Sequence, residues 1–256
     1  VSDDHDLLQR RARSLGPACR VFHEQPVHQG RGEGAWLFGA DGKRYLDCYN
    51  NVASVGHCHP QVVAALGKQA ATLNTHTRYL HENVVAYAER LGATLPGELS
   101  VCMFVCTGTE ANDLAVRIAR AVTGHEGVIV TEDAYHGNST TVYSLSTGEY
   151  PVDERPEWLE AAEAPCTYRG RFREPGAEAA MEFAGLIGDA MGRLSARGRG
   201  AAMFLTDNID SSNGVLTPDP AYLQEAYRLV RAAGGLAVAD EVQSGLCRLG
   251  DHFWGF

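Results

Sequence analysis

The sequence predicts an α/β protein whose mainly parallel sheet carries helices on both faces. Short apolar runs of strand length alternate with longer segments of helical periodicity. The runs at 127–132, 201–207 and 236–240 are almost entirely apolar, which is typical of parallel strands buried on both faces. Polar motifs follow several of the runs, at the strand ends where open parallel sheets bind their ligands.

Length and composition narrow the class of protein. The chain has 256 residues, 45% hydrophobic and 21% charged, so it is long enough to form a sizeable core. Its net charge of -10 argues against non-specific binding to nucleic acid or to an anionic membrane, and no apolar run reaches the length of a membrane span. The seven cysteines lack a repeated CxxC pattern, which favours reduced thiols in a cytoplasmic enzyme over a disulfide framework.

The first part of the chain predicts a hairpin and two helices. An Asp-Gly pair separates two aromatic-rich runs within 34–50, which is a strong hairpin signal. Apolar residues recur at helical spacing in 59–73 and in 81–96, where a Pro-Gly pair ends the second helix. We expect 1–75 to be an N-terminal segment of hairpin and helix that belongs to a small domain or an interface.

The remainder, 76–256, predicts a large domain built on the sheet. The expected strands are 100–106, 127–132, 201–207 and 236–240, and the expected helices are 109–124, 176–196 and 220–235. The stretch 133–175 shows neither periodicity, and we expect it to be irregular.

The first polar motif, Thr107-Gly108-Thr109, lies between an expected strand and an expected helix. Glycine lets a ligand approach the backbone closely, and the free N–H groups at a helix start favour an anion, most naturally a phosphate. The alternative is an ordinary helix cap, formed by Thr109 with Asn112 and Asp113 in the first turn.

The second motif, DAYHGN, places Tyr135 and His136 in a loop directly before Gly137. An exposed aromatic ring beside a glycine can stack on a flat ligand. The alternative is a turn whose tyrosine packs on the rim of the core.

The third motif, DEVQ, follows the last expected strand. A carboxylate held at a strand end can pair with a protonated ring nitrogen. Asp240 is the better candidate, because the side chain of Glu241 alternates to the other face. Gln243 can offer an amide to a phenolate oxygen. The alternative for this motif is a cap for the following turn.

A phosphate, a flat ring and a protonated ring nitrogen together describe one cofactor, pyridoxal 5'-phosphate. An acid at the pyridine nitrogen makes the ring an electron sink. Asp240 is the predicted catalytic residue. The predicted cofactor-binding residues are Gly108, Thr109, Tyr135, His136, Asp240 and Gln243.

Four motifs that span nearly the whole chain resemble the class III, or omega-type, aminotransferases of fold type I. They are WLFGADGKRYLDCYNNVASVGHCHPQVV, TGTEANDLAVRIAR, AYHG and ADEVQSGLCRLGDHFWGF, in this order. The resemblance implies that Gly108 and Thr109 belong to the phosphate cup, that Tyr135 stacks on the pyridine ring and that Asp240 faces the ring nitrogen. It places Gln243, or the neighbouring Val242 by packing, near the ring hydroxyl and the ring face.

The resemblance also has implications for the rest of the protein. It implies a homodimer with segment 50–80 at the interface, and a Schiff-base lysine beyond the DEVQ motif. The chain contains only Lys43, in the hairpin, and Lys68, on a helix face. Neither has the strand-end setting of a catalytic lysine. We therefore expect the chain to be the front part of a longer enzyme, with the C-terminal part of the large domain missing.

Some segments depart from the family pattern, and one apparent metal motif has a simpler interpretation. TDNIDSSNG at 206–214 stands where EPIQG is common, with Asp207 in place of the usual Glu, and GLCR stands for GFGR. We expect these departures to affect the substrate side of the site and the packing, and not the residues that bind the cofactor. His57-Cys58-His59 does not predict a metal site, because adjacent side chains of an extended chain point apart.

Three functions stay open. The first is transfer of an amino group from an amine or amino acid to an oxo-acid. The second is elimination of phosphate from a phosphorylated amine such as phosphoethanolamine, because CYNNVASVGHCHP and APCTYRGRFRE are similar to the branch that includes ethanolamine-phosphate phospho-lyase. In that case Arg78 can hold the substrate phosphate, although a surface or interface ion pair is slightly favoured for it. The third is a catalytically silent scaffold.

Overall fold

The computed structural model describes residues 4–49 and 53–256. The chain divides into two compact units, Val1–Val84 and Val85–Phe256. The functional boundary expected at 75/76 stays a prediction.

The first unit contains the predicted hairpin. Its elements are α1 (Asp4–Leu15), β1 (Gln29–Glu33), β2 (Trp36–Gly39), β3 (Arg44–Leu46) and α2 (Pro60–Thr72). β2 and β3 pair antiparallel, and Gly42 between them has a φ of 84°, which glycine adopts without strain. β1 extends the hairpin to a three-stranded sheet.

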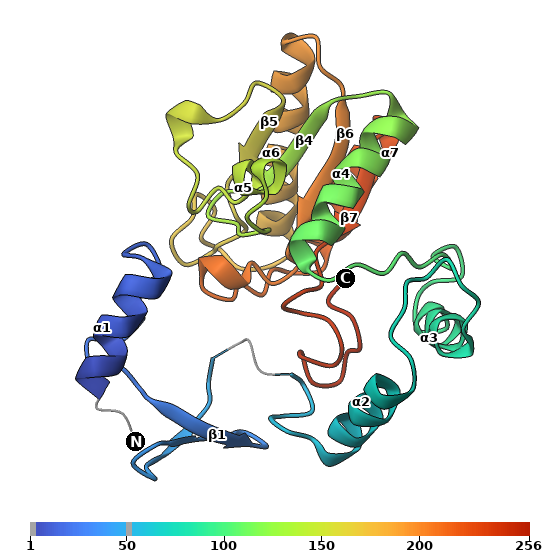
Figure 1. Cartoon of the computed structure of the whole chain (residues 1–256). Coiled ribbons are helices and arrows are strands. Elements are labelled where there is room, and N and C mark those ends of the chain that lie inside the picture. Colours follow the sequence, from blue (N-terminus) through green and yellow to red (C-terminus); the bar gives the residue numbers. More distant parts are fainter. Residues whose placement is uncertain (1–3, 50–52) are drawn as a thin grey trace. The chain divides into compact units, whose positions relative to one another are not determined.

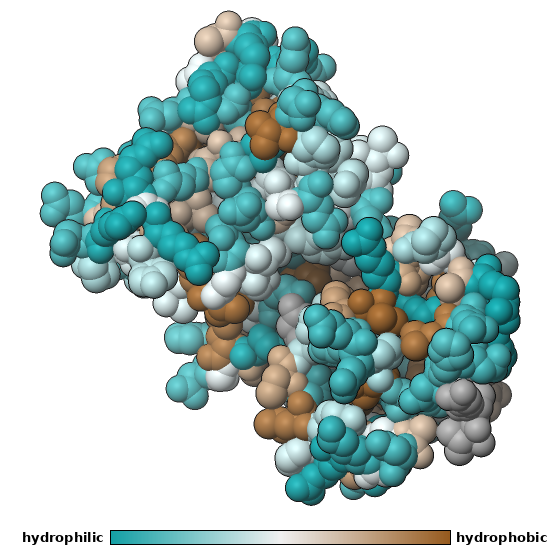
Figure 2. Space-filling view, turned by 90° about the vertical axis from the view of Figure 1, so that its left-hand side faces the viewer, coloured by the Kyte–Doolittle hydropathy of each residue, from teal (hydrophilic) through white to brown (hydrophobic). Residues whose placement is uncertain are grey.

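Helix α2 is amphipathic, but none of its residues is buried. Val62, Val63 and Leu66 on this helix are exposed. Figure 2 shows hydrophobic residues, in brown, among the hydrophilic residues of the face that it draws. Residues 50–52 of the predicted interface segment 50–80 lie outside the described residues.

The second unit contains the layered sheet. Its elements are α4 (Gly108–Thr123), β4 (Gly127–Thr131), α5 (Thr140–Leu145), β5 (Leu159–Ala162), α6 (Ala177–Ala196), β6 (Ala201–Thr206), α7 (Ala221–Ala232) and β7 (Leu236–Ala239), and α3 (Glu82–Gly92) joins it to the first unit in sequence. Two short 3₁₀ turns lie at Val152–Glu154 and Ser211–Asn213.

The four strands are parallel and lie in the order β5-β4-β6-β7. Helices α6 and α7 cover one face and α4 and α5 the other (Figure 1). Side chains alternate between the faces: Ile129 and Phe204 pack under α6 and α7, whereas Val128 and Val130 pack under α4 and α5. The predicted α/β class, with helices on both faces, is confirmed.

Two expectations about secondary structure are wrong. The run at 100–106 is not a sheet strand, because no strand among the described residues pairs with it and an unpaired backbone forms no ladder. The stretch 133–175 is not irregular throughout, since it contains α5 and β5. Strand β5 has Glu160 in its middle, whose charge hides the apolar pattern. In the structure this carboxylate pairs with Arg193 of α6 at 2.6 Å.

Two further observations concern the chain as a whole. The cysteines of the described residues are all free. Within the described ranges, no helix is both long enough and apolar enough to cross a membrane.

Candidate active site

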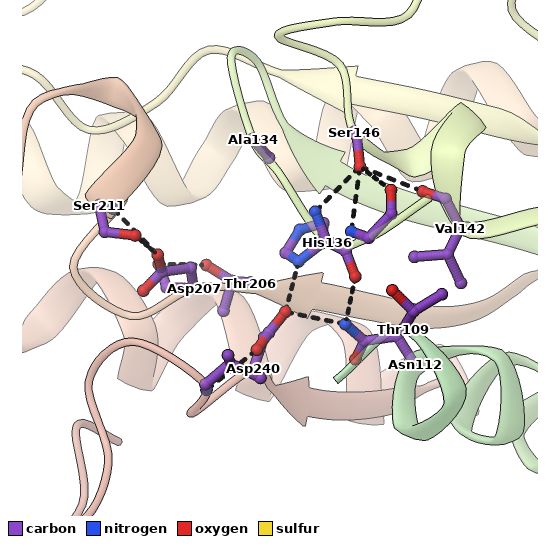
Figure 3. Close-up of polar contacts among 12 residues, drawn as sticks. Thr109, Asn112, Ala134, His136, Val142, Ser146, Thr206, Asp207, Ser211 and Asp240 are labelled. Carbon is purple, nitrogen blue, oxygen red and sulfur yellow. Dashed lines mark hydrogen bonds and ion pairs between the residues drawn. The ribbon is translucent and has the colours of Figure 1, made fainter. Parts of the chain in front are cut away.

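The three polar motifs come together at the carboxyl edge of the sheet. Asp240 follows β7, the loop with His136 follows β4, and α4 begins beside them (Figure 3). Two contacts join the motifs directly. Oδ2 of Asp240 lies 2.8 Å from Nδ1 of His136 and 2.9 Å from Nδ2 of Asn112.

The start of α4 offers two free backbone donors. The cap is Thr107, whose hydroxyl accepts the N–H of Glu110 at 3.1 Å, so the sequence-based alternative of a cap at Thr109 is wrong. Among the described residues, the N–H groups of Gly108 and Thr109 have no acceptor. Two free N–H groups at the positive end of a helix dipole suit an anion.

Two glycines lie where the motifs touch. A Cβ on Gly108 would lie 2.6 Å from Cγ2 of Val242. A Cβ on Gly137 would collide with the hydroxyl of Thr109, and the φ of Gly137 is 134°. The loop after β4 therefore packs closely against the backbone of Thr109, and the loop after β7 contacts Gly108 through the side chain of Val242.

Asp240 is buried and charged. Its side chain is 7% exposed. Burial raises the pKa of this carboxyl, but hydrogen bonds from His136, Asn112 and the N–H of Val242 outweigh burial and hold the pKa below its usual range. Oδ2 receives two donors and Oδ1 one, from Val242 at 3.1 Å. Since each oxygen has two lone pairs, Oδ1 keeps one acceptor position.

His136 is fixed by its backbone as well as by its ring. Its N–H donates to the hydroxyl of Ser146 at 3.0 Å, and the same hydroxyl donates to the carbonyl of Gly137 at 2.8 Å (Figure 3). Because the ring nitrogen Nδ1 faces an acceptor on Asp240, it is the nitrogen that carries a proton. Nε2 is buried and has no partner among the described residues.

The remaining predicted cofactor residues are accessible. Tyr135 is 45% exposed, in the loop directly before His136. Gln243 is half-buried and makes no hydrogen bond to the described residues. An aromatic ring and an amide are therefore free to meet a ligand at this edge of the sheet.

The other predicted residues lie in the first unit. Arg78 donates its backbone N–H to Nδ1 of His76 at 3.2 Å, and its role toward a substrate stays a prediction. Lys43 lies in the hairpin turn, with Nζ 4.9 Å from the centre of the Tyr45 ring. Lys68 is exposed on α2. Neither lysine is desolvated as a nucleophilic lysine requires.

Glu241 points away from Asp240, as the alternation of side chains predicts. Its carboxylate accepts the amide of Asn208 at 2.7 Å, the hydroxyl of Ser244 at 2.9 Å and the N–H of Gly255. Glu241 therefore connects the loops beyond the sheet through hydrogen bonds.

Sequence reasoning missed a buried acid after β6. Asp210 accepts a hydrogen bond from the hydroxyl of Thr131 at 2.9 Å. Burial raises the pKa of Asp210 to about 7, and the neighbouring carboxylate of Asp207 adds to the effect. Asp207 itself accepts the N–H of Ser211 at 2.9 Å. No signal distinguishes Asp210 in the sequence, because its burial depends on the packing of separate loops.

Comparison with known proteins places the chain in a family. The family described as "Aminotransferase class-III" matches residues 20–255. The alanine–glyoxylate aminotransferase 2-like protein of Drosophila melanogaster is 40% identical, over 98% of this chain and 52% of its own length. Ethanolamine-phosphate phospho-lyase homolog 1 of Caenorhabditis elegans is 33% identical, over 99% and 57%. The chain thus spans about half the length of these curated relatives.

Solved structures show the same fold. A phospholyase from Arthrobacter in complex with phosphoethanolamine is 40% identical, with a TM-score of 0.90 over 98% of this chain and 59% of its own. An omega-transaminase from Thermomicrobium roseum is 25% identical, with a TM-score of 0.82 over 100% and 60%. The fold is that of the fold type I transferases. The chain belongs to the class III aminotransferase family.

Proposed function

We propose that the protein is an enzyme that uses pyridoxal 5'-phosphate to act on small amines. The observation that carries the proposal is the pairing of two features at one edge of the sheet. One is the buried, ionised Asp240 with an open acceptor position, and the other is the free N–H pair at the start of α4. A solved relative that is 20% identical, the taurine:2-oxoglutarate aminotransferase of Bifidobacterium kashiwanohense, is in complex with this cofactor and glutamate.

The residues present fit the cofactor. The N–H groups of Gly108 and Thr109 would hold the phosphate, and the exposed ring of Tyr135 would cover the pyridine. The negative charge of Asp240 would keep the ring nitrogen protonated. Gln243 would meet the ring hydroxyl. When bound, the cofactor supplies a conjugated ring that withdraws electrons from the substrate carbon.

The finer proposal is transfer of an amino group from an amine or amino acid to an oxo-acid. The names of the relatives support it: the Drosophila protein is an alanine–glyoxylate aminotransferase 2-like protein and the Thermomicrobium enzyme is an omega-transaminase. The site of this chain would hold the cofactor, and Asp240 would maintain its electron-withdrawing state through both halves of the reaction.

A second candidate is elimination of phosphate from a phosphorylated amine. One observation favours it: the Arthrobacter phospholyase, 40% identical with a TM-score of 0.90, was solved with phosphoethanolamine bound. In this case Arg78 is the candidate for the substrate phosphate, since guanidinium groups bind phosphate in a bidentate manner.

The two reactions are separated by their products. The full-length protein, loaded with pyridoxal 5'-phosphate, is incubated with phosphoethanolamine alone and, separately, with an amine and pyruvate. Alanine formed in the incubation with the amine and pyruvate, without products from phosphoethanolamine alone, supports transamination. Inorganic phosphate, acetaldehyde and ammonia formed in equal amounts from phosphoethanolamine would instead support elimination.

A silent scaffold would give neither product. Borohydride reduction of the loaded protein, followed by peptide mapping, tests the anchoring of the cofactor independently of turnover. We expect no pyridoxyl group on Lys43 or Lys68. A stoichiometric adduct on Lys43 or Lys68 would contradict the proposed site.

We further propose a cytoplasmic homodimer, with segment 50–80 at the interface. The exposed apolar side chains of Val62, Val63 and Leu66 on α2 support this part of the proposal.

A further inference from the structure

Asn112 lies at the centre of the site, although its place in the sequence indicates only the first turn of a helix. Its side chain is buried, and the residue is 5% exposed. Its Nδ2 donates to Oδ2 of Asp240 at 2.9 Å and to the main-chain oxygen of His136 at 2.8 Å (Figure 3). Asn112 therefore connects α4 to the end of β7 and to the loop after β4.

The two partners of Asn112 determine which way its amide faces. A carboxylate and a carbonyl only accept hydrogen bonds, so the nitrogen of the amide faces both of them and both of its hydrogens are used. Leu and Asp are branched at Cγ like Asn, but neither can supply two N–H donors. The position thus requires an amide for a chemical reason.

Asn112 also limits how the Asp240 carboxylate can rotate. With Asn112 and His136 on Oδ2 and the N–H of Val242 on Oδ1, three donors from three segments fix the plane of the carboxylate. The free acceptor position on Oδ1 therefore has a fixed direction.

The other ionisable groups around this edge face different partners. Asp207, at the end of β6, binds the N–H and the hydroxyl of Ser211. Glu241 binds Asn208, Ser244 and Gly255. Among the described residues, His136 is the titratable side chain bonded to the carboxylate of Asp240.

We infer that Asn112 is a positioning residue for the cofactor. It holds the Asp240 carboxylate and the loop of His136 against the first turn of α4, so the anion end and the ring end of the site keep a fixed separation. This inference rests on the proposed function, because it assigns the roles of phosphate and ring nitrogen to those two ends.

Loss of the Asn112 amide has a predictable consequence. The N–H of Asn112 stabilises the charged form of Asp240, so its removal makes Asp240 easier to protonate. A neutral Asp240 no longer favours a protonated ring nitrogen. Retention of the cofactor should then fail at a higher pH than in the wild type.

The test compares three variants of the full-length protein loaded with pyridoxal 5'-phosphate. Asn112→Leu removes the donors, and Asn112→Asp places a second carboxylate beside Asp240. Asn208→Leu is the matched control, because Asn208 is equally buried and has two side-chain hydrogen bonds, to Glu241 at 2.7 Å and from Tyr227 at 2.9 Å. Cofactor absorbance after dialysis is measured over a pH series, together with the thermal midpoint.

We expect the pH of half-retention to rise by about one unit in Asn112→Leu. The rise should be larger in Asn112→Asp, since two adjacent carboxylates share a proton. Asn208→Leu should lower the thermal midpoint and leave the pH of half-retention unchanged.

Two outcomes would overturn the inference. One is an unchanged pH of half-retention in both Asn112 variants, of which Asn112→Asp keeps the native shape. The other is an equal shift in Asn208→Leu, which would reduce Asn112 to a general packing role. A wild-type protein that retains no cofactor would instead reject the proposed function.

Discussion

Nδ1 of His136 lies 2.8 Å from Oδ2 of Asp240, and both side chains are buried. The two residues are 104 positions apart in the sequence and come from the ends of two strands that are not adjacent in the sheet, β4 and β7. A buried carboxylate is costly unless it is hydrogen-bonded, and this one is bonded by three groups. The arrangement maintains a negative charge at the carboxyl edge of the sheet.

Asp240→Asn should preserve the fold and severely reduce turnover. The amide oxygen can still accept from Asn112 and His136, but the NH2 group cannot accept the N–H of Val242. The amide also carries no charge to keep a ring nitrogen protonated, so we expect kcat to fall about 100-fold or more. Steady-state kinetics of the full-length protein measure the loss. Glu241→Gln is the control, because it removes the charge of the neighbouring residue, which does not face Asp240. Turnover of Asp240→Asn at the wild-type rate would contradict the assignment.

Asp210→Asn should stabilise the protein, and more so as the pH rises. The folded-state pKa of Asp210 is about 7, above the ordinary value of 3.8. The folded state therefore binds more protons than the unfolded state between these values, and stability is lost as the pH rises from the lower value through the higher one. The penalty at pH 8 is up to ~4 kcal/mol. Asn can still accept the hydroxyl of Thr131.

Thermal midpoints at pH 5 and pH 8 check this prediction. The gain of Asp210→Asn over wild type should be larger at pH 8. Asp219→Asn is the control, since Asp219 is an exposed acid beside α7. Equal gains at both pH values would show that Asp210 is already ionised at pH 5 in the folded protein.

Gly108→Ala should weaken cofactor binding through a steric clash. The added Cβ would lie 2.6 Å from Cγ2 of Val242, so this side chain must move at the site. We expect the dissociation constant for pyridoxal 5'-phosphate to rise about 10-fold. The double variant Gly108→Ala with Val242→Ala should recover most of the affinity. Failure of this rescue in a fluorescence titration would point to a different role for Gly108.

Leu66→Glu should dissociate the proposed homodimer. Leu66 is 69% exposed on α2, and a charge there would oppose burial in an interface. Val122→Glu is the matched control, because Val122 is 70% exposed on α4, outside the proposed interface. Sedimentation equilibrium of the full-length protein should show a dimer for the wild type and Val122→Glu. A wild-type monomer that turns over substrate would exclude this interface.

The sequence was sufficient to predict three strands of the described parallel sheet and the meeting of the polar motifs at its carboxyl edge. β4, β6 and β7 are apolar runs, and the periodicity of α6 and α7 is strong, so local pattern predicts them. Strand β5 was missed because Glu160 breaks its pattern, and its charge is neutralised by Arg193 of a different element. The run at 100–106 has the composition of a strand, yet a strand also requires a neighbour, which composition does not reveal.

For single residues of the site, too, local sequence predicts some roles and not others. Asp240 and Thr109 could be singled out because they follow strands or begin a helix. The roles of Asn112 and Ser146 depend on contacts between separate elements, and Asn112 is 128 positions from its partner Asp240. Polar residues are common in the first turn of a helix. The local sequence of Asn112 therefore gives no reason to expect a buried side chain that hydrogen-bonds two other segments.

A crystal structure of the full-length protein with pyridoxal 5'-phosphate tests the central claim most directly. We predict the ring nitrogen at about 2.7–3.0 Å from Oδ1 of Asp240 and the phosphate on the N–H groups of Gly108 and Thr109. A ring nitrogen without contact to Asp240, or a phosphate bound away from the start of α4, would contradict the account.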